Sequence, residues 1–163
     1  MDASERLARV RQLLAGLPGP YGNEYLWASA WFAGREVVFT SVFEFLRDCA
    51  VIDGVSRFGD PPQAPQNDAE LASLLRQVDA ADAVELLAGL ASRTLAYHVA
   101  GRYPVEKAHD VFGRLRKLLG YDSRWWTNTT LGSWNPVTQH TFDALVVGMG
   151  DGVVVAVLAV DED

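Results

Sequence analysis

An apolar run near the end of the chain restricts its possible folds more than any other feature. Val153 to Val160 holds eight residues without one polar side chain, a length that suits a strand and is too short to cross a membrane. Gly150-Asp151-Gly152 comes directly before it, and a second β-rich run, Thr141 to Met149, precedes these three residues. Two such runs around a Gly-Asp-Gly turn predict a β-hairpin.

This hairpin needs cover from the rest of the chain. A lone hairpin is marginally stable in water, and a strand without polar positions is expected to be buried on both faces. The sequence therefore predicts either a helical layer over the hairpin or at least one further strand. Val37 to Phe39 and Leu131 to Trp134 are the candidates for that strand.

Apolar residues at helical spacing predict four or five helices. Asn67 followed by Glu70 forms a capping-box pattern, and Pro104 suits the first turn of a helix that Gly120 closes. The expected spans are Ser4 to Leu17, Thr40 or Ser41 to Cys49, Asn67 to Val78, Asp79 or Asp82 to Val99, and Pro104 to Gly120.

The stretch from Tyr25 to Phe32 fits two structures. Trp27 and Trp31 are four residues apart, which suits one face of a helix. Every second residue from Leu26 to Phe32 is apolar, which suits a strand instead. The small residues in the stretch and the stop signal at Gly34 favour a helix here.

Together these elements predict an α+β fold, with a helix-rich single domain spanning residues 1–163 and a small antiparallel sheet that includes the carboxyl-terminal hairpin. A hydrophobic fraction of 49% is enough to bury a sizeable core. The region from Asp53 to Gln66 holds three prolines and two glycines. It predicts a loop long enough to be either mobile or functional.

The chain carries a single cysteine, Cys49, which excludes an internal disulfide and is expected to be buried and inert within an apolar run. The first residues, Met1 to Arg6, lack the charged-then-apolar order of a signal peptide. No apolar run reaches the length of a membrane span. We therefore expect a cytoplasmic protein without membrane contact.

A formal charge of -7 argues against nucleic-acid binding, which usually needs a basic surface, and favours a basic protein partner. The charge is also segregated: residues 58–90 carry six acids against one base, and residues 91–124 carry seven bases against three acids. Two adjacent antiparallel helices could complement each other in this way. Alternatively, the acidic segment, with Asp60, Asp68, Glu70, Asp79 and Asp82, docks a cationic partner.

Residue patterns for catalysis or metal binding are weak. The three histidines show no metal-ligand spacing, and the chain has no HExxH or CxxC motif. His140 and Asp143 are three apart at a strand entry, so their side chains are expected on opposite faces. Cys49 and a distant histidine could meet in space as nucleophile and base, but one cysteine inside an apolar run is weak support for such a site. We therefore expect no metal, no cofactor and no enzymatic activity.

Aromatic residues supply the remaining candidates. Trp125 and Trp126 begin a polar stretch, Arg124 to Asn135, which also contains Trp134. These rings either belong to the core or anchor a partner, because Trp and Arg are enriched in interface hot spots. An alternative function is a small-molecule-binding domain or hydrolase, with a pocket lined by this stretch and His140.

The end of the chain resembles a known class of proteins. The residues concerned are Trp134-Asn135-Pro136-Val137-Thr138, Thr141-Phe142-Asp143 and the hairpin ending in Val160-Asp161-Glu162-Asp163. They resemble the carboxyl ends of bacterial polymorphic-toxin immunity proteins, small acidic proteins that bind and neutralise a cognate toxin. The resemblance implies a binder with no catalysis of its own, and an acidic inhibitor would suit a cationic nuclease toxin.

The leading hypothesis from the sequence is thus a protein-binding inhibitor of the toxin-immunity type. A third possibility, a structural subunit of a larger assembly, would require an exposed apolar face on the hairpin. The predicted binding residues are Asp60, Asp68, Glu70, Asp79, Asp82, Trp125 and Trp126.

Overall fold

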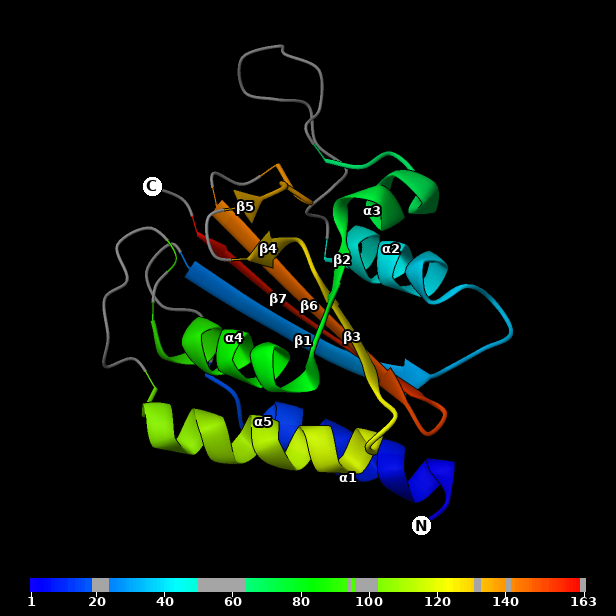
Figure 1. Ribbon diagram of the computed structural model, residues 1–163, viewed down its shortest axis with the longest axis vertical. Helices are drawn as coiled ribbons and strands as arrows, with labels where there is room; N and C mark the ends of the chain where they lie inside the picture. Colours follow the sequence, from blue (N-terminus) through cyan, green and yellow to red (C-terminus); the bar gives the residue numbers. More distant parts are fainter. Residues whose placement is uncertain are drawn as a thin grey trace.

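The computed structural model (Figure 1) describes residues 1–18, 24–49, 64–93, 95, 103–130, 133–139 and 142–161. Within these ranges the chain forms an α+β fold with five helices and a five-stranded antiparallel sheet. The strand order is β1-β7-β6-β3-β2. The predicted fold class, with its carboxyl-terminal hairpin, is confirmed.

The hairpin consists of β6 (Phe142–Gly150) and β7 (Val153–Asp161). Asp151 and Gly152 connect the two strands with φ values of 48° and 81°. Positive φ at both loop residues is the signature of a type I′ turn, whose twist matches that of the flanking strands. Every residue of β7 is buried, as the absence of polar positions predicts.

Strand β1 (Glu24–Phe32) covers one side of the hairpin, so the helix that we expect over Tyr25 to Phe32 is wrong. It pairs with β7 along its whole length, from Glu24 opposite Asp161 to Phe32 opposite Val153. This pairing outweighs the local preference for helix, because a buried central strand such as β7 must satisfy its backbone groups on both sides.

Strands β3 (Arg124–Thr127) and β2 (Arg76–Val78) complete the sheet on the other side of the hairpin. Neither of the two segments expected as a third strand occupies this place. Val37 is the N-cap of a helix. Strand β5 (Ser133–Trp134) pairs with β4 (Thr129–Thr130) in a separate two-stranded sheet.

Helix α2 (Val38–Asp48) therefore begins where a short strand was expected. Its buried residues, Val42 and Leu46, are one helical turn apart. Burial of this stripe against the sheet outweighs the strand preference of the valines at its start.

Helix α3 (Asp68–Leu74) has the predicted cap, since the Glu70 backbone N–H donates to Asn67 Oδ1 over 2.8 Å. It ends before the expected limit at Val78 because the backbone becomes extended at Leu75, with ψ of 141°. The following three residues form β2. Apolar residues at helical spacing thus continue past the end of the helix into an edge strand.

The other helices are α1 (Ala3–Ala15), α4 (Ala80–Ser92) and α5 (Val105–Leu119). Helix α1 is capped by Asp2 rather than Ser4. Helix α4 starts after Asp79, as one reading of the sequence predicted, but it ends at Ser92. The backbone is extended at Arg93, so the helix does not continue toward Val99 as expected. Residues 96–102 lie outside the described ranges.

The helices lie in two layers, one on each face of the sheet (Figure 1). Helices α1, α4 and α5 pack on the face that includes Val155 and Val157, whereas α2 and α3 pack on the face that includes Ala156 and Leu158. Consecutive residues of β7 thus enter opposite cores, as the alternation of side chains along a strand requires. Both faces of the hairpin are covered within the described part of the chain.

Candidate functional site

The acidic residues predicted to bind a partner do not form one cluster. Asp68 and Glu70 lie in the first turn of α3, whereas Asp79 and Asp82 lie at the start of α4. These helices belong to opposite layers, and β2 connects them along the edge of the sheet (Figure 1). Asp60 lies outside the described residues.

Asp68 and Glu70 hold local structure. The Thr40 hydroxyl donates to Asp68 Oδ2 over 2.6 Å, which ties α3 to α2. The Gln66 backbone N–H donates to Glu70 Oε2, also over 2.6 Å, and so fixes the chain that enters α3. Hydrogen bonds to a carboxylate are among the stronger ones in proteins. These two acids therefore have structural roles that their charge alone did not reveal.

Asp79 and Asp82 differ from them in having uncommitted carboxylates. Asp79 is the N-cap residue of α4, but its side chain makes no capping hydrogen bond. An N-cap aspartate normally accepts a hydrogen bond from a backbone N–H one turn ahead. Both side chains are exposed. With Gln77 and Val78 of β2 they line a shallow, open hollow at the edge of the sheet.

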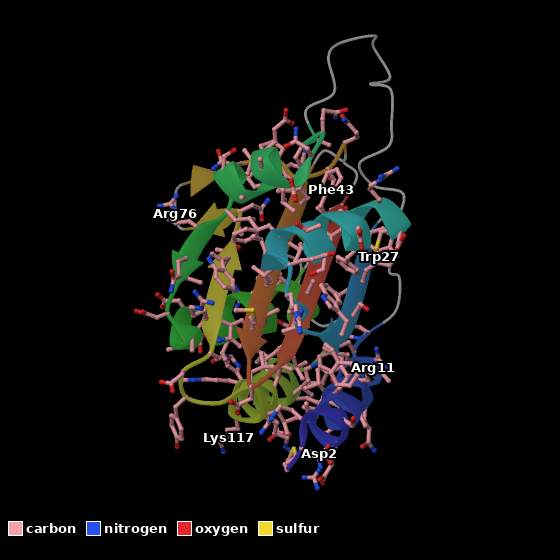
Figure 2. The ribbon with its side chains drawn as sticks, turned by 90° about the vertical axis from the view of Figure 1, so that its right-hand side faces the viewer. Asp2, Arg11, Trp27, Phe43, Arg76 and Lys117 are labelled. Atoms are coloured by element: carbon pink, nitrogen blue, oxygen red, sulfur yellow. The ribbon has the colours of Figure 1, made fainter. Side chains whose placement is uncertain are left out.

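We call the surface formed by Gln77, Val78, Asp79 and Asp82 the acidic edge. Its negative charge lies at the amino end of α4, where the helix dipole stabilises anions. Figure 2 shows β2, with Arg76 labelled, at the outer margin of the sheet. The acidic edge can thus present charge and strand backbone to the same partner.

Helices α4 and α5 are joined by a pair between Glu85 and His109, a residue that is not among the seven bases counted in residues 91–124. Glu85 Oε1 of α4 lies 3.0 Å from His109 Nε2 of α5, and His109 Nδ1 lies 2.9 Å from the backbone oxygen of Val105. Both ring nitrogens face acceptors, which favours the doubly protonated ring. The hydrogen bond with Glu85 is the main cause that raises the pKa of His109.

Trp125 and Trp126 are both buried, with exposed fractions of 1% and 8%. As neighbours on β3 they point to opposite faces, Trp125 into the core beside α4 and α5 and Trp126 into the core beside α2 and α3. Their position answers the question left open by the sequence, because neither ring stands exposed as an anchor. The exposed tryptophan in this region is Trp134, at 41%.

Close packing explains how Trp125 fits. Its ring lies over Gly148, the residue opposite it on β6, and a Cβ atom at Gly148 would lie 2.5 Å from the ring. The indole N–H donates to Ser123 Oγ over 3.0 Å. On the other face, Trp126 meets Phe39 edge to face with ring centroids 5.5 Å apart. Both tryptophans are therefore structural residues.

Asp143 organises the segment after β3, a role that the sequence did not suggest. This buried carboxylate accepts hydrogen bonds from Asn128 Nδ2, Trp134 Nε1, and the backbone N–H groups of Val137 and Thr138, over 2.7 to 3.2 Å. The Thr138 hydroxyl adds a further bond of 2.8 Å. The sequence did hold one signal for this role, which is an acid within an apolar, β-rich run. A carboxylate at such a position is buried only when hydrogen bonds compensate for the loss of water.

The environment of Asp143 acts on its charge in two directions. Burial raises its pKa and is the larger effect, whereas the hydrogen bonds from Thr138, Trp134 and Val137 act to lower it. These donors lie within residues 134–138, shortly before β6. In this chain they form a structural network around the carboxylate.

The remaining candidates for chemistry give no site within the described residues. His140 lies outside them, so the structure does not test the pocket predicted around it. Burial is the main cause that raises the pKa of the Cys49 thiol to about 11, so the reactive thiolate is scarce at neutral pH. The described part of the chain contains no group of three or more His, Cys, Asp or Glu residues placed to hold a metal ion.

None of the helices in the described ranges is long and apolar enough to cross a membrane. No protein-family model matches the sequence, and no curated protein matches it either. The acidic edge is the best candidate surface because the carboxylates of Asp79 and Asp82 are exposed and line a hollow beside an edge strand.

Proposed function

We propose that the protein is a stoichiometric inhibitor of the toxin-immunity type, which binds a basic partner protein at its acidic edge. The observation that carries this proposal is the pair of exposed, uncommitted carboxylates of Asp79 and Asp82 beside an edge strand. Acids at an exposed rim raise the association rate with a cationic partner and exclude partners of like charge. The net charge of -7 extends this attraction beyond the contact itself.

A basic toxin, such as a nuclease with a cationic substrate site, fits this surface. Such a site is built to attract phosphate groups, and an acidic protein surface can occupy it in their place. Inhibition by this route needs no catalytic group on the inhibitor. It requires only that the bound protein blocks access of substrate to the partner.

The first experiment captures the partner and then measures binding with purified components. The whole chain is used as bait in extracts of the cells that produce it, and the captured protein is purified for calorimetry. We expect a basic protein whose activity falls to zero at a 1:1 ratio. An acidic partner, or one whose activity persists at saturation, would overturn the proposal.

Charge-removing variants locate the binding surface. Asp79→Asn/Asp82→Asn removes two charges while keeping residue types that suit a helix start. We expect the affinity to fall by about tenfold or more, mainly through a slower association that depends less on salt. The matched control, Glu44→Gln/Asp48→Asn, removes two exposed charges from α2 in the opposite layer. Equal losses in both double variants would contradict a role for this edge in particular.

A further inference from the structure

The direction of the backbone groups in β2 follows from a hydrogen bond on the far side of β3. The Leu145 N–H of β6 donates to Asn128 Oδ1 over 2.7 Å, so it points toward β3. Backbone groups of successive residues point alternately to the two neighbouring strands. Val147 therefore also points to β3, and Trp126, its partner in the register, points back to β6.

The same alternation continues into the edge strand. Trp125 and Thr127 direct their N–H and C=O groups toward β2, where their partners are Val78 and Arg76. Gln77 lies between these two residues, so its N–H and C=O point away from β3. Figure 2 shows β2 at the margin of the sheet. Because β2 is the last strand, these groups face outward.

The opposite edge of the sheet provides an independent check. Continued through β7, the alternation turns Ala156 toward β1 and its partner Ser29 toward β7, so the groups of Ala30 must point outward. The Arg11 side chain donates to the Ala30 oxygen from Nε over 3.0 Å and from Nη2 over 2.9 Å. The Arg11 side chain of α1 can reach the Ala30 oxygen because this oxygen accepts no hydrogen bond from a neighbouring strand.

The outward groups of Gln77 have no such partner among the described residues. They open onto the hollow that Val78, Asp79 and Asp82 also line. A free N–H and C=O on one edge residue is the pair that an antiparallel strand uses to dock, because such a strand exchanges both hydrogen bonds with a single residue.

We propose that the basic partner docks by strand addition: an extended, cationic segment pairs antiparallel to β2 through the N–H and C=O of Gln77. This inference rests on the proposed function and specifies how the partner binds. It makes the partner segment a sixth strand of the sheet. The backbone supplies the register, and the acidic edge supplies the preference for positive charge.

The arrangement of the edge also predicts where the basic side chains lie. Gln77 is opposite Trp126, whose side chain enters the core beside α2 and α3. The residue of the partner paired with Gln77 therefore projects to that same face. Of its two neighbours, the one opposite Val78 projects to the face of α4, where Asp79 and Asp82 begin the helix. The other lies opposite Arg76 on the same face, where a second positive charge would be repelled. A segment with a basic residue opposite Val78 and an uncharged one opposite Arg76 fits this edge.

Three synthetic peptides test this docking mode on the whole protein by NMR. The first is an acetylated and amidated octapeptide of alternating Thr and Arg, with Thr placed to pair with Gln77 and Ala in place of the Arg that would lie opposite Arg76. The second carries N-methyl groups on its threonines, which removes the donor to the Gln77 oxygen and keeps the charge. The third has Glu in place of Arg.

We expect the first peptide to shift the Gln77 amide proton downfield and to slow its exchange with solvent by about tenfold when bound. The N-methylated peptide should bind at least about tenfold more weakly, and the glutamate peptide should not bind. Equal affinities of the two arginine peptides would overturn strand addition and leave the charge-based proposed function standing. If neither arginine peptide perturbs the Gln77 amide, strand addition is overturned, and the charge-removing variants decide on the proposed function.

Gln77→Pro tests the same contact from the side of the protein. Proline removes an N–H that points outward, so the ladder between β2 and β3 stays intact, and edge strands tolerate proline at such positions. We expect this variant to retain its melting temperature within a few degrees and to lose the Thr-Arg peptide. Gln77→Ala, which keeps the N–H, should bind as the wild type does. Full binding of the Thr-Arg peptide by Gln77→Pro would overturn the proposal. If this variant does not fold, the comparison of the N-methylated and unmethylated peptides on the wild-type protein gives the answer.

Discussion

The two edge strands of the sheet, β1 and β2, differ in length and in the charged side chains that lie beside them. Strand β1 offers nine residues along one margin, and Arg11 of the same chain donates two hydrogen bonds to an outward oxygen on it. Strand β2 offers three residues along the other margin, and its neighbours on α4 are acids. A long edge invites uncontrolled pairing with other chains, and a charged side chain across it reduces that risk. The short edge needs no such protection and can remain selective through charge.

The tryptophans that pack beside the two edge strands also differ in burial and hydrogen bonding. Trp125, opposite Val78 of β2, is 1% exposed and has its indole N–H bound to Ser123. Trp31 on β1 is half-buried against Phe45, and its indole N–H is buried without a partner in the described part of the chain. The acidic edge therefore rests on the better satisfied tryptophan.

The largest effect is expected from the ring beneath the acidic edge. Trp125→Ala should lower the free energy of unfolding by about 3 to 5 kcal/mol, because it leaves a cavity between β3, β6 and α4. Trp31→Phe on the other edge should cost less than about 1 kcal/mol, because it removes an unsatisfied N–H together with some apolar contact. Urea unfolding of both variants measures the difference. Similar losses would show that the two edges are supported alike.

Proline scanning of β2 tests the assigned directions of its backbone groups. Val78→Pro removes an N–H that points to β3 and leaves the partner oxygen of Trp125 without its donor, at a cost of about 1 to 3 kcal/mol. Gln77→Pro one residue earlier should cost far less. Thermal unfolding followed by circular dichroism gives both values. A larger loss for Gln77→Pro would reverse the assignment and remove the basis for strand addition.

On the long edge, Arg11→Met should release the Ala30 oxygen while keeping most of the apolar stem of the side chain. We expect a loss of about 1 kcal/mol in stability, because the bond is only part-buried, and a tendency to self-associate through β1. Sedimentation velocity at increasing concentration detects such association. Arg9→Met is the control, since Arg9 pairs with Glu5 on the exposed side of the same helix. Monomeric behaviour of both variants would mean that β1 is protected by something other than Arg11.

How far the sequence predicts this molecule depends on whether a pattern is local. The hairpin was predictable because its turn, Asp151-Gly152, lies between the two strands that it joins and fixes their register. The capping box at Asn67 is equally local. Strand β1 was not predictable in this way, because Trp27 and Trp31 are four residues apart, and that spacing places two side chains on one face in a helix and in a strand alike. Only the pairing with β7 decides between them.

The candidate site shows the same limit. The sequence identified all four described acids, but it could not show that Asp68 and Glu70 are held by Thr40 and by the Gln66 backbone. These partners come from outside the helix that carries the acids. The free groups of Gln77 were equally hidden, because they depend on a hydrogen bond two strands away. A sequence shows which residues are charged, whereas tertiary contacts determine whether a charged group is free to bind a partner.

The smallest effect is expected from the His109–Glu85 pair, which joins α4, the helix of the acidic edge, to α5. The folded-state pKa of His109 is raised above its unfolded value. The pair should therefore stabilise the protein fully at a pH below the unfolded value of about 6.5, and this contribution should be lost as the pH rises through the raised pKa. Its size should stay below about 0.5 kcal/mol, because the side chains of His109 and Glu85 are 40% and 71% exposed and solvent screens the pair. Melting temperatures of the wild type and His109→Gln should therefore differ in acid and converge at alkaline pH, with Asp143 cancelling because both proteins contain it. Glu85→Gln should show the same pH-dependent difference in melting temperature. A difference that stays constant with pH in either variant would mean that titration of His109 does not contribute to the stability of this pair.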